Sequence, residues 1–98
     1  MIYLHDGIHL MAELGANERG QIVSADTPEL HDFARRIGLQ RFWFQRDRFH
    51  PHYDVFGSRP EAALRDGAIA IHWRNLRECM ALARRESRMV EIREIIGA

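Results

Sequence analysis

Short stretches of alternating apolar and polar residues predict several β-strands in this chain. In the first, residues 2–5 alternate between two faces, and the Asp6-Gly7 pair that follows is typical of a turn. Asp6 also lies at a strand end, a common place for a functional side chain in α/β folds. Similar patterns predict strands over residues 21–25, from Tyr53 onward, and over residues 68–73. Residues 8–20 fit a short helix followed by a loop.

Two helices are predicted by their start signals. Asp26 or Thr27 can cap a helix that has Pro28 at its first position, and an apolar stripe then continues to Ile37. A second helix begins after Ser58, which forms a capping box pattern with Glu61. Asp66-Gly67 ends that helix.

A long C-terminal helix is predicted over residues 75–96, with Asn75 as its cap. About 20 helical residues span ~30 Å, which is long for a domain of this size. Apolar residues fall on two lines of the helix, so one sheet face cannot cover them all. We expect the surplus surface to pair with a second copy in a homodimer, which makes this helix a candidate oligomerisation element.

The order of these elements indicates one α/β domain over residues 1–98. Strands that alternate with helices favour a short mixed or partly parallel sheet with flanking helices. A chain of 98 residues is long enough for one such domain.

Composition narrows the choice of partners and compartment. Fourteen Arg balance fourteen acidic residues, so no net charge attracts the chain to nucleic acid or an anionic membrane. The single Cys79 excludes an internal disulfide and fits a small core residue. Without a signal peptide or an apolar run of membrane-spanning length, we expect a cytoplasmic protein.

The candidate site is the segment from His50 to Asp54, which holds two imidazoles, a phenol and a carboxylate. His50, His52 and Asp54 alternate along an extended chain and would project from one face, as ligands for zinc or iron(II). His5, Asp6 and His72 would join them if the strand ends converge. Alternatively, His52 acts as a general acid or base that Asp54 orients.

A second hypothesis places a phosphate group at the start of the second helix. Free backbone N–H groups at a helix N-terminus favour an anion, and Ser58 and Arg59 would add donors. Asp6 and Tyr53 complete the predicted ligand-binding residues.

A third hypothesis is structural. His52, Tyr53 and Asp54 would form a buried hydrogen-bonded network, and the C-terminal helix would be the interaction surface. The aromatic residues of segment 39–49 lie among arginines, a pattern that can stack bases, although a core role is favoured for them.

Several motifs resemble the bacterial and phage family of unknown function DUF4031. The motifs are Tyr3-Leu4-His5-Asp6, Ala25-Asp26-Thr27-Pro28-Glu29-Leu30-His31, Arg36-Ile37-Gly38-Leu39, Trp43-Phe44-Gln45, His52-Tyr53-Asp54, Gly67-Ala68 and Trp73-Arg74. The chain departs from the pattern at Ser58-Arg59-Pro60, where the family more usually has a Lys-Arg pair. The resemblance implies the fold and the location of the site.

The sequence therefore predicts a small domain that binds a phosphate-bearing ligand, such as a nucleotide or a nucleic-acid end, at its strand-to-helix junctions. The alternatives are a non-catalytic interaction domain and a metal-dependent hydrolase that uses His50, His52 and Asp54. No Gly-rich phosphate loop is present, and we expect no cofactor.

Overall fold

One long strand is the centre of the fold in the computed structural model, which describes residues 1–97. The six strands of the sheet are β1 (Ile2–His5), β2 (His9–Ala16), β3 (Ile22–Ala25), β4 (Tyr53–Asp54), β5 (Ile69–Ile71) and β6 (Val90–Glu91). The first half of β2 pairs with β1 and β4, and its second half with β3 and β6, all antiparallel. On its other side β1 pairs with β5 in parallel. The sheet is therefore mixed, as predicted.

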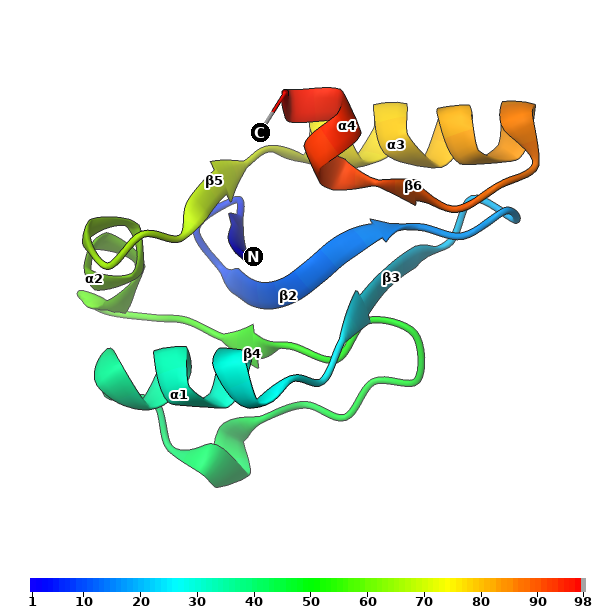
Figure 1. Cartoon of the computed structure of the whole chain (residues 1–98). Coiled ribbons are helices and arrows are strands. Elements are labelled where there is room, and N and C mark those ends of the chain that lie inside the picture. The colour runs from blue at the N-terminus through cyan, green and yellow to red at the C-terminus, as the bar shows by residue number, and fades with distance from the viewer. Residues whose placement is uncertain (98) are drawn as a thin grey trace.

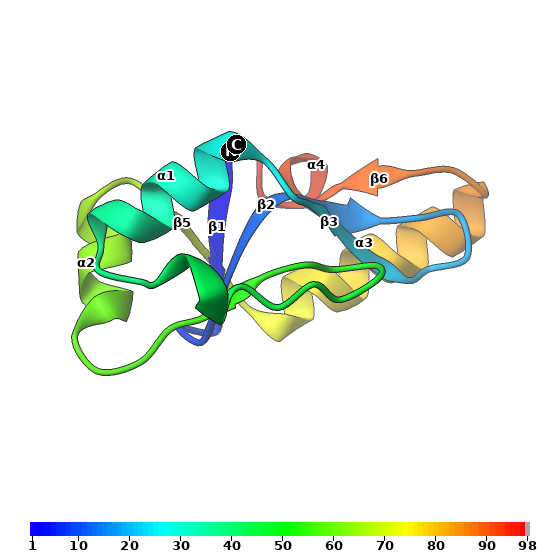
Figure 2. The same ribbon diagram turned by 90° about the horizontal axis from the view of Figure 1, so that it is seen from below.

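Helices cover both faces of this sheet. They are α1 (Pro28–Arg36), α2 (Arg59–Arg65), α3 (Trp73–Glu86) and α4 (Ile92–Ile96), with a 3₁₀ turn, η1 (Arg41–Trp43). In Figure 1, α1 lies on one side of β2, and α3 and α4 lie on the other. Figure 2 shows α1 and α2 near one end of the molecule and the turn from α3 into β6 near the other. Two hydrophobic clusters result, one centred on Leu30 and Tyr53 and one on Leu14 and Leu76. The predicted α/β class is confirmed.

The central strand β2 was not predicted, and the helix expected within residues 8–20 is wrong. Leu10, Met11 and Ala12 are all buried, because neighbours cover both faces of the strand. A strand buried on both faces lacks the alternation that marks a strand in sequence. At Glu13 the backbone takes φ of +50°, and the register with β3 shifts between Ala12 and Gly15. This irregularity bends β2 between its two sets of partners.

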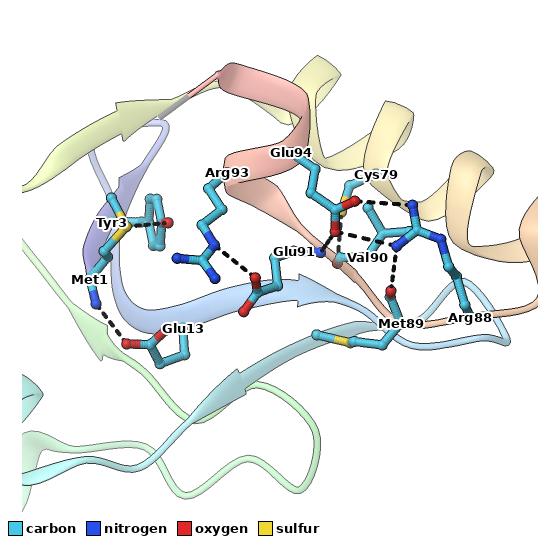
Figure 3. Close-up of polar contacts among 10 residues, drawn as sticks. All are labelled: Met1, Tyr3, Glu13, Cys79, Arg88, Met89, Val90, Glu91, Arg93 and Glu94. Atoms are coloured by element: carbon cyan, nitrogen blue, oxygen red, sulfur yellow. Dashed lines mark hydrogen bonds and ion pairs between the residues drawn. The ribbon is translucent and has the colours of Figure 1, made fainter.

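The long C-terminal helix is also wrong: α3 ends at Glu86. Ser87 adopts the left-handed conformation that ends a helix, with φ of +50°. The chain then reverses, adds β6 to the sheet and finishes as α4. Figure 3 shows the contacts that hold this return, in which the Arg88 guanidinium donates to Glu94 Oε1 at 3.0 Å. The Cys79 thiol donates to the Val90 carbonyl at 3.3 Å, which fits the core role predicted for this cysteine.

Most apolar residues near the end of the predicted helix are covered within the chain, although Met89 is exposed. Val90 and Ile92 are fully buried, and Ile95 and Ile96 pack partly buried against the same cluster. The apolar surplus from which the homodimer was predicted is therefore largely absorbed by β6 and α4. The homodimer stays a prediction. No helix among residues 1–97 combines the length and the apolar character required to cross a membrane.

The predicted capping residue makes the expected contact in one case of three, although α2 does begin directly after Ser58 as predicted. Thr27 Oγ1 accepts a hydrogen bond from Leu30 N at 3.1 Å, as a capping threonine does. Ser58 precedes α2, but its side chain makes no capping hydrogen bond within residues 1–97, so that capping box is wrong. α3 begins two residues before the predicted cap, with His72 at the N-cap. Asn75 Oδ1 accepts from His72 N at 2.8 Å.

Candidate functional site

Two histidines face each other across the β1–β2 hairpin. Asp6 and Gly7 make the turn, with φ of +50° and +71°, and the register then places His5 opposite His9. The imidazole rings are stacked, with their centroids 5.9 Å apart. The predicted turn is confirmed.

β4 brings a third histidine and a carboxylate to the same place. His9 pairs with Asp54 across β2 and β4, and an isolated bridge joins His52 to Gln45 just before β4. The rings of His9 and His52 meet edge to face, with centroids 4.7 Å apart. Residues that are 45 positions apart in the chain therefore meet at one edge of the sheet.

These side chains form a donor set with the dimensions of a metal site. His9 Nδ1 lies 3.0 Å and His52 Nε2 lies 3.4 Å from Asp54 Oδ1, and all three donor atoms are within 4.8 Å of one another. Around an ion bound tetrahedrally at ~2.1 Å, ligand atoms lie about 3.4 Å apart. Within residues 1–97 this is the one group of three such residues that could hold a metal ion.

A backbone contact sets the tautomer of His52. Its Nδ1 lies 2.9 Å from the His50 carbonyl oxygen, which can only accept, so Nδ1 carries the proton. In the neutral ring, Nε2 then carries a lone pair that faces the Asp54 carboxylate. Two acceptors that face each other are stabilised by a cation between them.

The other oxygen of Asp54 is held from outside the donor set. Gln45 Nε2 donates to Asp54 Oδ2 at 2.5 Å, which leaves Oδ1 directed toward the two imidazoles. Outer contacts of this kind fix the orientation of metal ligands. The carboxylate itself is exposed, so water and a ligand can reach this point.

His5 lies beside this group, buried and without a hydrogen bond. Its residue is 9% exposed, and Nε2 has no hydrogen-bond partner among residues 1–97. Asp6 Oδ2 is 3.2 Å from Nε2 but without the alignment of a hydrogen bond. Burial lowers the pKa of His5, the Asp6 charge opposes this, and His9 and His72 add to the lowering. Burial therefore favours the neutral form of this ring, which stacks on His9.

His50 does not join the donor set, in contrast to the predicted metal ligands His50, His52 and Asp54. Its Nδ1 lies 3.5 Å from Asp47, and its ring stacks on His52 with centroids 5.8 Å apart. The chain bends at Arg48 and Phe49, and His50, which follows this bend, pairs with Asp47 and not with Asp54. His9 takes the place expected for His50.

Asp6 and His72 lie at the margin of the site. Asp6 Oδ1 accepts from Trp73 N at 3.2 Å, at the start of α3, and lies 3.7 Å from His72 Nδ1. The Trp73 ring packs against His5, with centroids 6.0 Å apart. The strand ends therefore do converge, although Asp6 serves the helix start and not the donor set.

Tyr53 points to the opposite face of the sheet, so the predicted network of His52, Tyr53 and Asp54 is wrong. Its hydroxyl lies 2.8 Å from His31 Nδ1, and the other ring nitrogen of His31 contacts Asp26 Oδ1. Burial raises the pKa of Tyr53, and the positive charge of Arg41 opposes this. Adjacent residues in a strand face opposite sides, which separates Tyr53 from Asp54. Its predicted ligand-binding role stays a prediction.

The predicted phosphate donors lie apart from the donor set. Arg59 Nε and Nη2 each donate to the Gly38 carbonyl at 3.2 Å, and the guanidinium lies over the ring of Phe56. Arg59 therefore joins α2 to the end of α1. Anion binding by Ser58 and Arg59 stays a prediction.

Sequence reasoning missed His9 because it lay in the segment expected to be helical. The signal that would have found it is Asp6-Gly7, a dipeptide typical of β-hairpins. A hairpin at this turn places His9 across from His5 and therefore beside the strand end that carries Asp6.

No curated protein and no solved structure matches this chain. The family described as "Protein of unknown function (DUF4031)" matches residues 20–84, from the loop before β3 into α3. The match includes His52 and Asp54 but begins after His9 and after the opening Tyr3-to-Asp6 motif. With most of its length matched, the chain belongs to the DUF4031 family.

Proposed function

We propose that this domain binds a divalent transition-metal ion through His9, His52 and Asp54, and uses it to hold and hydrolyse a phosphate-bearing ligand. The observation that carries the proposal is the convergence of two imidazole nitrogens and one carboxylate oxygen within 4.8 Å. Two histidines and one carboxylate suit zinc or iron(II).

The donor set leaves room for chemistry. Zinc takes four or five ligands and iron(II) up to six, so three protein donors leave positions for water and a ligand oxygen. The exposed carboxylate of Asp54 is consistent with such an open site. In the hydrolysis we propose, bound water loses a proton to solvent, and its oxygen forms a bond to phosphorus. The bond from phosphorus to the leaving oxygen breaks, and that oxygen takes a proton from solvent.

The test begins with metal uptake by the full chain, purified without a histidine tag and stripped with a chelator. Re-equilibration with Zn²⁺ or Mn²⁺ should give one ion per chain by elemental analysis. A ligand present at 100 times its Kd stabilises the native state by about 2.7 kcal/mol, which raises Tm by roughly 10 °C or more in a domain of this size. Absence of stoichiometric metal and of any thermal shift contradicts the proposal.

The hydrolytic part is tested separately with the metal-loaded chain. Release of inorganic phosphate from a phosphomonoester such as p-nitrophenyl phosphate should require the metal and be lost in His52→Ala. If the loaded chain binds one metal but releases no phosphate from any phosphoester tried, the domain is a metal-binding module and not a hydrolase.

A further inference from the structure

An aromatic pocket adjoins the proposed metal site. It has a volume of about 760 Å³ and is lined by Phe42, Trp43, Phe44, Gln45, Asp54 and Phe56. Asp54 and Gln45 are also the carboxylate ligand and its hydrogen-bond partner. A ligand in this pocket would therefore lie against the Asp54 carboxylate of the proposed metal site.

Two of the aromatic residues that line the pocket are largely exposed to water. Phe42 is 81% exposed and Phe56 is 50% exposed. The core role expected for the aromatic residues of segment 39–49 is wrong for Phe42 and Phe49, which are exposed, although Phe44 is buried. The Trp43 ring joins the two, with centroids 6.0 Å from Phe42 and 5.5 Å from Phe56. Contiguous exposed aromatic rings indicate a binding surface.

Cations accompany these rings. The Arg59 guanidinium lies 4.6 Å from the centroid of Phe56 and 5.5 Å from that of Trp43. Arg41 lies over Phe44 at 5.2 Å. Aromatic faces with adjacent arginines suit a planar base joined to an anionic group. A purely apolar partner would instead remove water from the exposed Asp54 carboxylate without giving it a new polar contact, which is costly.

We infer that this pocket is a nucleobase subsite, so that the ligand of the metal site is a nucleoside phosphate or the phosphorylated end of a single strand. The base stacks on Phe42 and Trp43, and the phosphate reaches the ion beside Asp54. The phosphate half of this inference rests on the proposed function, whereas the base half rests on the aromatic pocket alone.

The test compares AMP with ribose 5-phosphate by calorimetry on the Zn²⁺-loaded full chain. The two ligands share the phosphate and differ in the base, so AMP should bind roughly 5- to 150-fold more tightly, the range given by stacking on an aromatic side chain. Phe42→Ala should remove this advantage. Phe49→Ala is the matched control, since Phe49 is 39% exposed but lies outside the pocket lining. It should leave the advantage intact.

Two further comparisons distinguish a free nucleotide from the end of a strand, and the base subsite from the metal site. A 5′-phosphorylated tetra-adenylate that binds more tightly than AMP identifies a strand end, and equal binding identifies a free nucleotide. Equal affinity of the loaded chain for AMP and ribose 5-phosphate overturns the base subsite, as does an undiminished advantage in Phe42→Ala. If the chain takes up no metal but still binds adenosine in a Phe42-dependent manner, the metal proposal fails and the base subsite stands.

Discussion

His9 Nδ1 lies 3.0 Å from Asp54 Oδ1, although the two residues belong to different parts of the chain. The contact depends on β2, because pairing of β2 with β4 sets His9 directly opposite Asp54. The same pairing leaves His50 outside the donor set. The structure therefore places His9 in the donor set and His50 outside it.

The first prediction separates these two histidines. His9→Ala should weaken Zn²⁺ binding by at least about 100-fold. Loss of a residue that only supports a metal ligand typically weakens binding by about 10- to 100-fold, and loss of a ligand should cost at least as much. His50→Ala should bind Zn²⁺ as the native chain does, because the His50 carbonyl that holds His52 Nδ1 belongs to the backbone and remains. Competition with a chromogenic chelator measures both affinities. A larger loss in His50→Ala than in His9→Ala would restore the ligand set expected from the sequence.

A second prediction concerns the orientation of the carboxylate. Gln45→Ala removes the hydrogen bond to Asp54 Oδ2, so the carboxylate can rotate away from the imidazoles. We expect a loss of roughly 10- to 100-fold in metal affinity, with the donor set still complete. Gln40→Ala, at the exposed residue that precedes η1, is the matched control. Equal affinity in both variants would show that Asp54 needs no support.

The fold could be predicted from sequence where residues alternate or caps are explicit, and not elsewhere. β1, β3 and α1 carry those signals, and the structure has them close to the expected bounds. β2 is buried on both faces, and its register with β3 shifts between Ala12 and Gly15. Its sequence therefore shows neither the alternation of a half-buried strand nor the spacing of an amphipathic helix. Its misassignment concealed His9, because only the hairpin register brings this histidine to the site.

The C-terminal error has a different physical cause. Apolar residues resume at Met89 after the polar residues 84–88, and no Gly or Pro in that stretch forbids a helix there. What ends α3 is tertiary: Ser87 turns left-handed, and the free edge of β2 accepts β6. Candidate site residues could be found by residue type, as His52 and Asp54 were, but their grouping required the pairing of distant strands.

A third prediction tests the close approach of β6 to β2. A Cβ atom added at Gly15 would lie 2.4 Å from the Val90 carbonyl oxygen and 2.7 Å from Met89 Cε. Gly15→Ala should therefore lower the free energy of unfolding by about 1–3 kcal/mol, as overpacking does. Urea unfolding followed by circular dichroism measures the change.

A double variant identifies which of the two contacts matters. The Met89 side chain can move aside, whereas the Val90 carbonyl belongs to the paired backbone of β6. Gly15→Ala should thus remain just as destabilising when it is made in the Met89→Ala chain. Full recovery of stability in that background would show that the side chain, and not the strand pairing, meets the added methyl group.

A fourth prediction follows from the buried thiol. Burial raises the pKa of Cys79 to about 11, and the nearby Glu94 charge acts in the same direction. An unfolded thiol ionises near pH 8.5, so between about pH 9 and 11 the unfolded chain binds fewer protons than the folded one. Stability should fall as pH rises through this range.

Tyr3 and Tyr53, whose pKa values are also raised by burial, add to the same slope. The Cys79→Ala variant isolates the contribution of the thiol. Its unfolding free energy should fall less steeply with rising pH than that of the native chain, and the remaining fall should come from the two tyrosines. Chemical unfolding at a series of pH values measures both chains. At pH 8, Ellman's reagent should react with Cys79 only after unfolding. Rapid reaction in the native protein would mean that the thiol is not covered by β6.

The last prediction concerns the two ends of α4. Ile92 is fully buried against α3, whereas Ile96 at the other end of α4 is only partly buried. Ile92→Ala should cost about 2–5 kcal/mol in unfolding free energy, the usual range for a buried isoleucine. Ile96→Ala should cost clearly less, because the removed atoms already touch solvent. Removal of the residues after Arg88 should be more damaging than either substitution, because it takes away β6 and uncovers Cys79 and Ala83. A shortened chain that keeps a cooperative unfolding transition of full amplitude would show instead that the C-terminal return is an accessory to a domain complete at α3.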